Sequence, residues 1–159
     1  MQELVQKLGN ILLKKRKFLT CAESCTGGMV STMITDCPGA SQFFDRGFIT
    51  YSNAAKIDML GVSAQTLECY GAVSEECAIE MALGALDNSN ADISVAITGI
   101  AGPGGGAPDK PVGLVCIATC SKNGAAKSHK NNFSGARKEV RKASTQKAFE
   151  LLVELAGTI

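Results

Sequence analysis

One nine-residue run, DISVAITGI at positions 92–100, constrains the fold of this chain more than any other stretch. Its apolar residues follow one another almost without interruption, which is typical of a strand in a sheet that is covered on both faces. A second apolar run, VGLVCIATC at 112–120, predicts another buried strand. Helix-like segments lie before, between and after the predicted strands, so the chain is expected to be an α/β protein.

The remaining elements follow from periodicity and from stop signals. Strands are predicted at 17–23 and 43–52, with a more polar edge strand at 127–134. Helices are predicted at 2–15, 26–36, 53–62, about 75–86 and 135–157. The expected fold is a single domain over residues 1–159, a three-layer α/β/α sandwich around a mixed, mostly parallel sheet.

Local details of these helices can also be predicted. Ser63 and Ser74 are each placed to cap a helix, and Ser134 is placed to cap the last one. In the 26–36 helix we expect Met29, Met33 and Ile34 to face inward. These are the details that the tertiary structure can overturn most easily.

Composition excludes several classes of function. Sixteen basic and fifteen acidic residues leave a net charge of +1, so neither nucleic acid nor a membrane surface is an expected partner. Seven scattered cysteines include no C-x-x-C pair, and there is one histidine, so no metal or other cofactor is expected. Residues 1–17 have scattered charges and no continuous apolar core, which favours a reduced, cytoplasmic protein.

The stretch TCAESCTGG, positions 20–28, stands where a predicted strand passes into a helix. A side chain at such a turn can be presented above the end of the sheet, and the first N–H groups of the helix can hold an anion. Ser24 is therefore a candidate nucleophile. The alternatives are that Ser24 or Thr26 only caps the helix, or that Cys25 is the nucleophile if the fold brings His129 close.

TYSNAAK, positions 50–56, places a tyrosine and a lysine at the end of one element and the start of the next. Lys56 can act as a base only if burial or a nearby positive charge lowers its pKa. Otherwise Lys56 is a solvated surface charge and Tyr51 an amphipathic edge residue.

TGIAGPGGG, positions 98–106, is not a phosphate-binding loop of the G-x-x-x-x-G-K-[ST] type. Thr98 nevertheless ends a strand where ligands collect in open α/β sheets, although a purely structural loop is the alternative. Arg137 falls in the first turn of the last helix, where the helix dipole disfavours a cation. That placement indicates either a bound anion such as phosphate or an ion pair with a neighbouring acid.

Taken together and in order, these segments resemble the C-terminal domain of the CinA family, whose stand-alone members are nicotinamide-nucleotide amidohydrolases. The resemblance is carried by TCAESCTGG, FFDRGFITYSNAAK, GAVSEE, TGIAGPGGG with KPVG, and FSGARKEVR, and it spans about residues 3–155. It implies an α/β/α sandwich that deamidates nicotinamide mononucleotide, a small-molecule nucleotide, for pyridine-nucleotide salvage.

The resemblance also implies roles for individual residues. Ser24 would be the nucleophile, Lys56 the general base, and Tyr51 would assist proton transfer. The expected substrate-binding residues, with Arg137 on the phosphate, are Thr26, Gly27, Thr98, Gly99 and Arg137.

A homo-oligomer is expected, with a dimer favoured. Three alternative functions are a catalytically silent nucleotide-binding or regulatory domain, an amidase for another phosphorylated amide, and a structural domain. A structural domain would leave Lys56 and Arg137 solvated and far apart.

Overall fold

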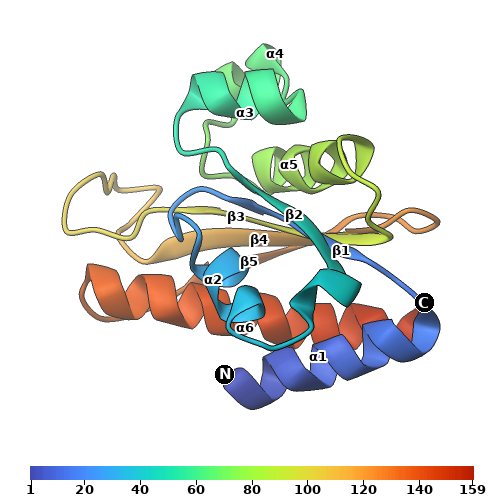
Figure 1. Cartoon of the computed structure of the whole chain (residues 1–159). Helices are drawn as coiled ribbons and strands as arrows, with labels where there is room; N and C mark the ends of the chain where they lie inside the picture. The colour runs from blue at the N-terminus through green and yellow to red at the C-terminus, as the bar shows by residue number, and fades with distance from the viewer.

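A computed structural model describes all residues, 1–159, and places five strands in one sheet in the order β2-β1-β3-β4-β5. Figure 1 shows the sheet between two layers of helices. The α/β/α sandwich is confirmed. The strands are β1 (Leu19–Glu23), β2 (Phe44–Ile49), β3 (Ile93–Gly99), β4 (Leu114–Ser121) and β5 (Lys127–Asn132).

The sheet is mixed, and one strand accounts for that. β1 pairs in parallel with both β2 and β3, whereas β4 pairs antiparallel with β3 and with β5. Four strands therefore run in one direction and β4 alone opposes them. The carboxyl ends of β1, β2 and β3 consequently lie side by side at one end of the sheet.

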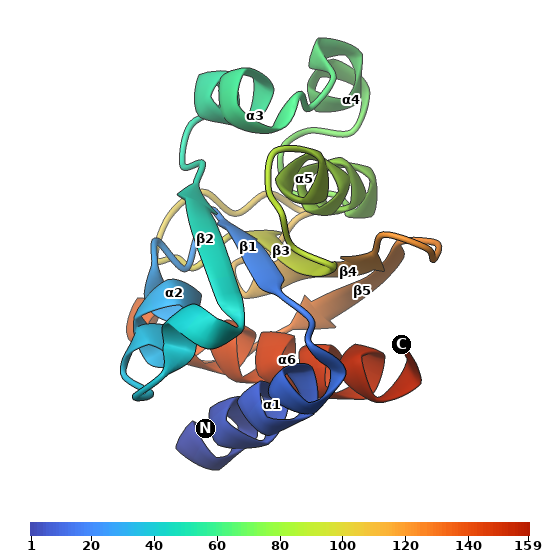
Figure 2. The same ribbon diagram turned by 45° about the vertical axis from the view of Figure 1, so that its right-hand side comes forward.

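The helices divide between the two faces of the sheet. α1 (Gln2–Lys15), α2 (Met29–Thr35) and α6 (Arg137–Thr158) cover one face, with the short helix η1 (Ala40–Gln42) nearby. α5 (Glu75–Asp87) packs directly on the other face, and α3 (Asn53–Leu60) and α4 (Ala64–Cys69) lie beyond it (Figure 2). Each face encloses its own hydrophobic cluster, because β-strand side chains alternate between the two faces.

Serine caps begin three of the helices, as local chemistry requires. The hydroxyl oxygens of Ser52, Ser63 and Ser74 accept hydrogen bonds from N–H groups in the first turns of α3, α4 and α5. The predicted caps at Ser63 and Ser74 are confirmed. The predicted cap at Ser134 is wrong, because α6 begins at Arg137 after Ala136 and has no side-chain cap.

The inward face of α2 differs from the prediction. Val30 and Ile34 are fully buried, whereas Met29 and Met33 are only partly buried. The helix begins at Met29, three residues later than expected, because Gly27 and Gly28 both take left-handed conformations. The inward face is therefore centred on a different residue.

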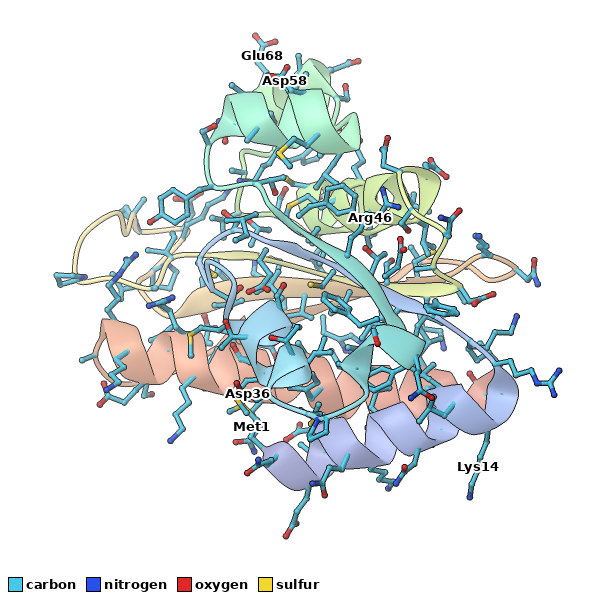
Figure 3. The ribbon with its side chains drawn as sticks, viewed as in Figure 1. Met1, Lys14, Asp36, Arg46, Asp58 and Glu68 are labelled. Atoms are coloured by element: carbon cyan, nitrogen blue, oxygen red, sulfur yellow. The ribbon has the colours of Figure 1, made fainter.

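Charged side chains lie on the outward faces of several helices. Figure 3 shows Lys14 on α1, Asp58 on α3 and Glu68 on α4 pointing away from the sheet, and all three are exposed. None of the helices has the length and apolar content that a membrane crossing requires.

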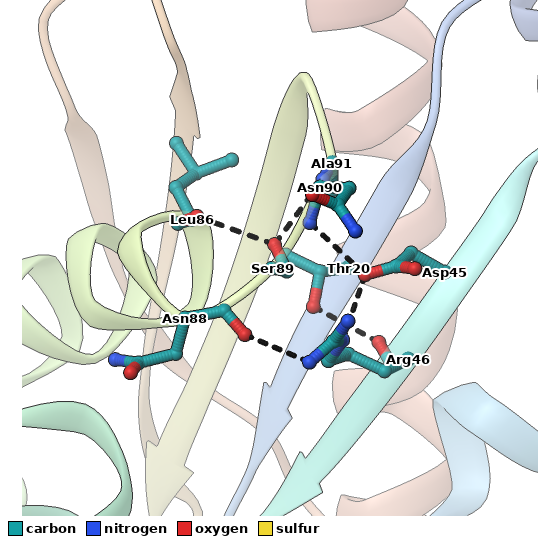
Figure 4. A network of polar contacts seen from close by, with 8 residues as sticks. All are labelled: Thr20, Asp45, Arg46, Leu86, Asn88, Ser89, Asn90 and Ala91. Carbon is teal, nitrogen blue, oxygen red and sulfur yellow. Dashed lines mark hydrogen bonds and ion pairs between the residues drawn. The ribbon is translucent and has the colours of Figure 1, made fainter.

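A polar network fixes the edge strand β2 at the end of the sheet opposite the carboxyl ends (Figure 4). Arg46 bonds Asp45 at 2.7 Å and donates to the Asn88 carbonyl at 3.1 Å, which ties β2 to the end of α5. The Asp45 carboxylate also accepts from the Asn90 N–H at 3.1 Å, and Thr20 donates to the Arg46 carbonyl at 2.9 Å. The register of β1 and β2 is thus held, and the other ends of the strands remain free for a site.

Candidate active site

Most of the predicted site residues converge where the parallel strands end, whereas Thr26 and Gly27 lie in the turn after Ser24 and do not line the cavity there. Ser24 follows β1, Tyr51 follows β2, and Thr98 and Gly99 end β3. Open α/β sheets bind ligands in this region, just beyond the carboxyl ends of their strands. A cavity of about 200 Å³ lies there, and it is lined by Ser24, Cys25, Tyr51, Asn53, Lys56, Ala72, Val73, Thr98, Gly99, Ala101 and Arg137.

Lys56 is buried, with only 1% of its surface exposed, so the alternative of a solvated surface charge is wrong. Its Nζ donates to Ser24 Oγ at 3.1 Å and to the Thr50 carbonyl at 2.9 Å. No carboxylate lies within ion-pair distance of the amine. Burial lowers the pKa of Lys56, because removal of water penalises the charged form, and nearby cysteine thiols oppose the shift only in part.

α3 places this amine. Ser52 caps the helix and fixes where it begins, so Lys56 falls in its first turn on the side that faces the sheet. Ser24 is 8% exposed and faces the cavity rather than open solvent. The site therefore combines a serine hydroxyl with a buried amine that has no acidic partner, the two groups that a lysine-assisted serine nucleophile requires.

Glu23 does the capping that sequence reasoning gave to Ser24 or Thr26. The Glu23 carboxylate is fully buried and accepts from the N–H groups of Gly28, Val30 and Ser31 at 2.9–3.1 Å, and from the Ser31 hydroxyl at 2.9 Å. These N–H groups at the start of α2 therefore do not serve as an anion site. Glu23 is the only acid in TCAESCTGG, which was the available signal in the sequence, but a capping acid normally lies outside the strand.

Two other N–H groups remain without partners in the turn. The N–H groups of Cys25 and Thr26 donate no hydrogen bond to any other residue of the chain, and the buried Thr26 hydroxyl has no partner either. Gly27 adopts a φ of 57°, in the left-handed region, which lets the chain turn back into α2. The turn thus presents unused backbone donors directly after Ser24.

Cys25 is buried, and burial raises the pKa of its thiol to about 11 although Arg141 and Lys56 oppose the shift. The thiol is therefore protonated at neutral pH. His129 cannot activate it, because it lies in β5, which β3 and β4 separate from β1. The structure favours the serine over the thiol.

Arg137 reaches across the mouth of the cavity. It donates to the Gly102 carbonyl at 2.9 Å and to the Tyr51 hydroxyl at 3.1 Å. It makes no ion pair, so the alternative of a neighbouring acid is wrong. The Tyr51 hydroxyl contacts this guanidinium and makes no hydrogen bond to Ser24 or Lys56.

Thr98 and Gly99 line the cavity from the end of β3. The Thr98 hydroxyl donates to the Ala72 carbonyl at 2.7 Å, which joins β3 to the turn before α5. A Cβ at Gly99 would lie 2.7 Å from a Val115 methyl, so this position requires glycine for the approach of β4. No group of three or more His, Cys, Asp or Glu side chains is placed to hold a metal ion.

The CinA C-terminal domain family profile matches residues 1–156. The chain belongs to this family. Similar proteins include the nicotinamide-nucleotide amidohydrolase PncC of Enterobacter agglomerans, which is 52% identical over 89% of this chain and 86% of its own length. PncC of Escherichia coli K12 is 46% identical over 96% and 92% of the two chains.

Longer family members contain the same unit. A CinA-like protein of Fervidobacterium nodosum is 50% identical over 95% of this chain, but the match covers 37% of that protein. Among solved structures, the competence/damage inducible protein CihA of Agrobacterium tumefaciens superposes with a TM-score of 0.95 at 45% identity, covering 97% of this chain and 94% of that one. These likenesses support the fold over its whole length.

Several residues that build the site of this CinA domain were not predicted from its sequence. Ala72 and Val73 line the cavity from the turn between α4 and α5, and Arg141 reaches the Ser24 turn from α6. Small apolar side chains in a turn carry no chemical signal in a sequence. Arg141 is one of sixteen basic residues, and only its contacts distinguish it.

Proposed function

We propose that this CinA-family chain hydrolyses the carboxamide of nicotinamide mononucleotide to give nicotinate mononucleotide and ammonia. The PncC relatives, which match over most of both chains, bear the name nicotinamide-nucleotide amidohydrolase. The observation that carries the proposal is the 3.1 Å contact between the Lys56 amine and the Ser24 hydroxyl. That amine is buried and has no carboxylate partner. That pair suits attack on an amide without a metal.

In the proposed mechanism the neutral amine of Lys56 accepts the hydroxyl proton as Ser24 Oγ attacks the carboxamide carbon. Lys56 then gives that proton to the departing nitrogen, which leaves as ammonia and breaks the C–N bond. Water attacks the resulting acyl-enzyme, again with Lys56 as the base, and releases the carboxylic acid with Ser24 restored. The lowered pKa of Lys56 supports this role, because a smaller fraction of the amine is protonated than in an ordinary lysine.

The tetrahedral intermediate carries a negative oxygen that needs donors. The unpartnered N–H groups of Cys25 and Thr26 are the nearest candidates along the chain, since they immediately follow the nucleophile. Nucleophile turns of α/β-hydrolases use the N–H of the residue after the serine in the same way.

Arg137 is proposed to hold the substrate phosphate at the cavity mouth. Tyr51 was expected to assist proton transfer, but because its hydroxyl contacts Arg137 and not Ser24 or Lys56, it is proposed to lie beside the phosphate instead. Thr26, Gly27, Thr98 and Gly99 are proposed to shape the rest of the substrate site.

Ammonia release from nicotinamide mononucleotide is the direct test, beside a panel of other phosphorylated amides. The wild-type chain is expected to release ammonia and nicotinate mononucleotide, and Ser24→Ala to lose turnover. Cys25→Ala is the matched control and should retain substantial activity, because the buried thiol is not the nucleophile. Substrate binding without ammonia release would refute the proposal and indicate a silent nucleotide-binding domain.

A further inference from the structure

Arg141 contacts the nucleophile turn although it lies more than a hundred residues away in the chain. Its Nε donates to the Cys25 carbonyl at 3.0 Å, and its Nη2 donates to the Thr26 carbonyl at 2.7 Å. The side chain is half-buried and makes no ion pair. A guanidinium can hold two successive carbonyls at once because its donors lie in a rigid plane.

These contacts determine where the free N–H groups of the turn point. A trans peptide is planar, and its C=O and N–H are directed oppositely. The Cys25 carbonyl shares its plane with the Thr26 N–H, so Arg141 on the carbonyl turns that N–H away from α6. The Ser24 carbonyl accepts from the Gly27 N–H at 3.1 Å and fixes the Cys25 N–H in the same manner.

The other side of the turn is held independently. Glu23 accepts from three N–H groups at the start of α2, which fixes the point where the turn enters the helix. The Thr26 carbonyl also accepts from the Met29 N–H at 3.3 Å, whereas Arg141 is the only partner of the Cys25 carbonyl, the carbonyl that shares its peptide with the Thr26 N–H. Arg141 Nη2 lies 3.6 Å from where a Cβ on Gly27 would be.

We infer that Arg141 is a positioning residue for catalysis: it locks the Cys25–Thr26 peptide so that the N–H groups of both residues stay free for the oxyanion. The inference rests on the proposed function for its chemistry. Arg141 acts through the backbone and does not touch the substrate, unlike Arg137 one turn earlier on α6.

Three variants separate this role from a general contribution to folding. In Arg141→Met both donors are lost, so kcat should fall by about 10–100-fold while KM changes little, since removal of one oxyanion donor typically costs about 10²–10³ in kcat. A lysine can hold only one of the two carbonyls, so the kcat of Arg141→Lys should lie between the kcat of Arg141→Met and that of the wild type. Lys142→Met is the matched control, because Lys142 is exposed on the same helix and makes no polar contact, and it should behave as wild type.

A fluorophosphonate probe gives a readout that needs no amide substrate. Ser24 Oγ attacks phosphorus, the P–F bond breaks, fluoride leaves, and the hydroxyl proton passes through Lys56 to solvent. The phosphoryl oxygen then takes the position of the oxyanion. Labelling of the wild-type and Lys142→Met proteins on Ser24 is expected, with Arg141→Met labelled at least about tenfold more slowly at a temperature where circular dichroism shows it folded.

The outcomes are distinguishable. Slow labelling and low kcat in folded Arg141→Met support the inference. Wild-type rates in that variant, or no labelling of the wild-type chain, would overturn it. A rise in KM for nicotinamide mononucleotide but not for the unphosphorylated riboside, with kcat unchanged, would also overturn it and assign Arg141 to the phosphate. Arg141-dependent labelling without ammonia release would refute the proposed amidase function alone.

Discussion

Gly84 on α5 controls how closely α3, and with it Lys56, approaches the sheet. A Cβ on Gly84 would lie 1.9 Å from the Leu60 carbonyl oxygen and 2.7 Å from its carbonyl carbon. Leu60 is the last residue of α3 and lies one turn beyond Lys56. Because ordinary contacts need about 3.5 Å, Gly84→Ala must push this end of α3 outward by more than about 1 Å.

The expected effect has two parts. Overpacking of a backbone contact lowers the free energy of unfolding by about 1–3 kcal/mol. Replacing a helical glycine with alanine raises it by about 0.5–1 kcal/mol, which offsets part of that loss. At roughly 2–4 °C per kcal/mol for a chain of this size, Tm should fall by several degrees. Displacement of Lys56 by about 1 Å from Ser24 should lower kcat by up to about a hundredfold.

Thermal unfolding and ammonia-release kinetics on the folded variant measure both parts. Gly157→Ala is the matched control, because Gly157 is also helical and nothing lies within 4 Å of where its Cβ would be. The control should be as stable and active as wild type. If Gly84→Ala equals wild type in Tm and kcat, the close packing of α3 on α5 does not position the base.

Further predictions concern the ionisable groups. Lys56→Met should lower kcat by about 10²–10⁴-fold, and Ser24→Ala combined with it should cost little more, since the pair acts as a unit; multiplied losses would contradict this. Because burial lowers the pKa of Lys56, wild-type kcat/KM should rise with pH through a pKa below that of ordinary lysine; a flat profile would count against Lys56 as base. The unfolded chain binds this proton more tightly, so the free energy of unfolding should rise between the lowered and the ordinary pKa, and the rise should vanish in Lys56→Met. Arg137→Ala should raise KM for nicotinamide mononucleotide about 10–100-fold and affect the riboside less, because a charge-assisted bond contributes about 1.5–3 kcal/mol; equal losses would assign Arg137 to the fold. Glu23→Gln should cost about 1.5–3 kcal/mol in urea unfolding, whereas exposed Glu150→Gln should not; equal stability would refute the capping role of Glu23.

Several features of this protein are determined by short stretches of its sequence. The apolar run of β3 requires cover on both faces, and this gives the layered fold. Ser63 and Ser74 cap their helices because a hydroxyl reaches an N–H two or three residues ahead, whatever the rest of the chain does. Such signals are contained within a few residues, so a sequence reveals them.

The failures at Ser134 and Met29 mark the limit of local signals. Ser134 has the chemistry of a cap, but Gly135 at a φ of 111° lets the chain continue before α6 begins at Arg137. Met29 and Val30 suit a helix equally, and docking against α6 and the sheet decided which of them is buried.

The chemistry of the site was decided by tertiary structure. Ser24 and Lys56 are 32 residues apart, and they meet only because α3 packs on α5 above the end of β1. Lys56 has a lowered pKa because that packing removes water from its amine. No pattern in the sequence indicates that this lysine is buried. Arg141 reaches the turn across 116 residues. Contacts of this kind depend on the packing of all the layers at once, and therefore only the folded chain determines which polar groups become buried partners.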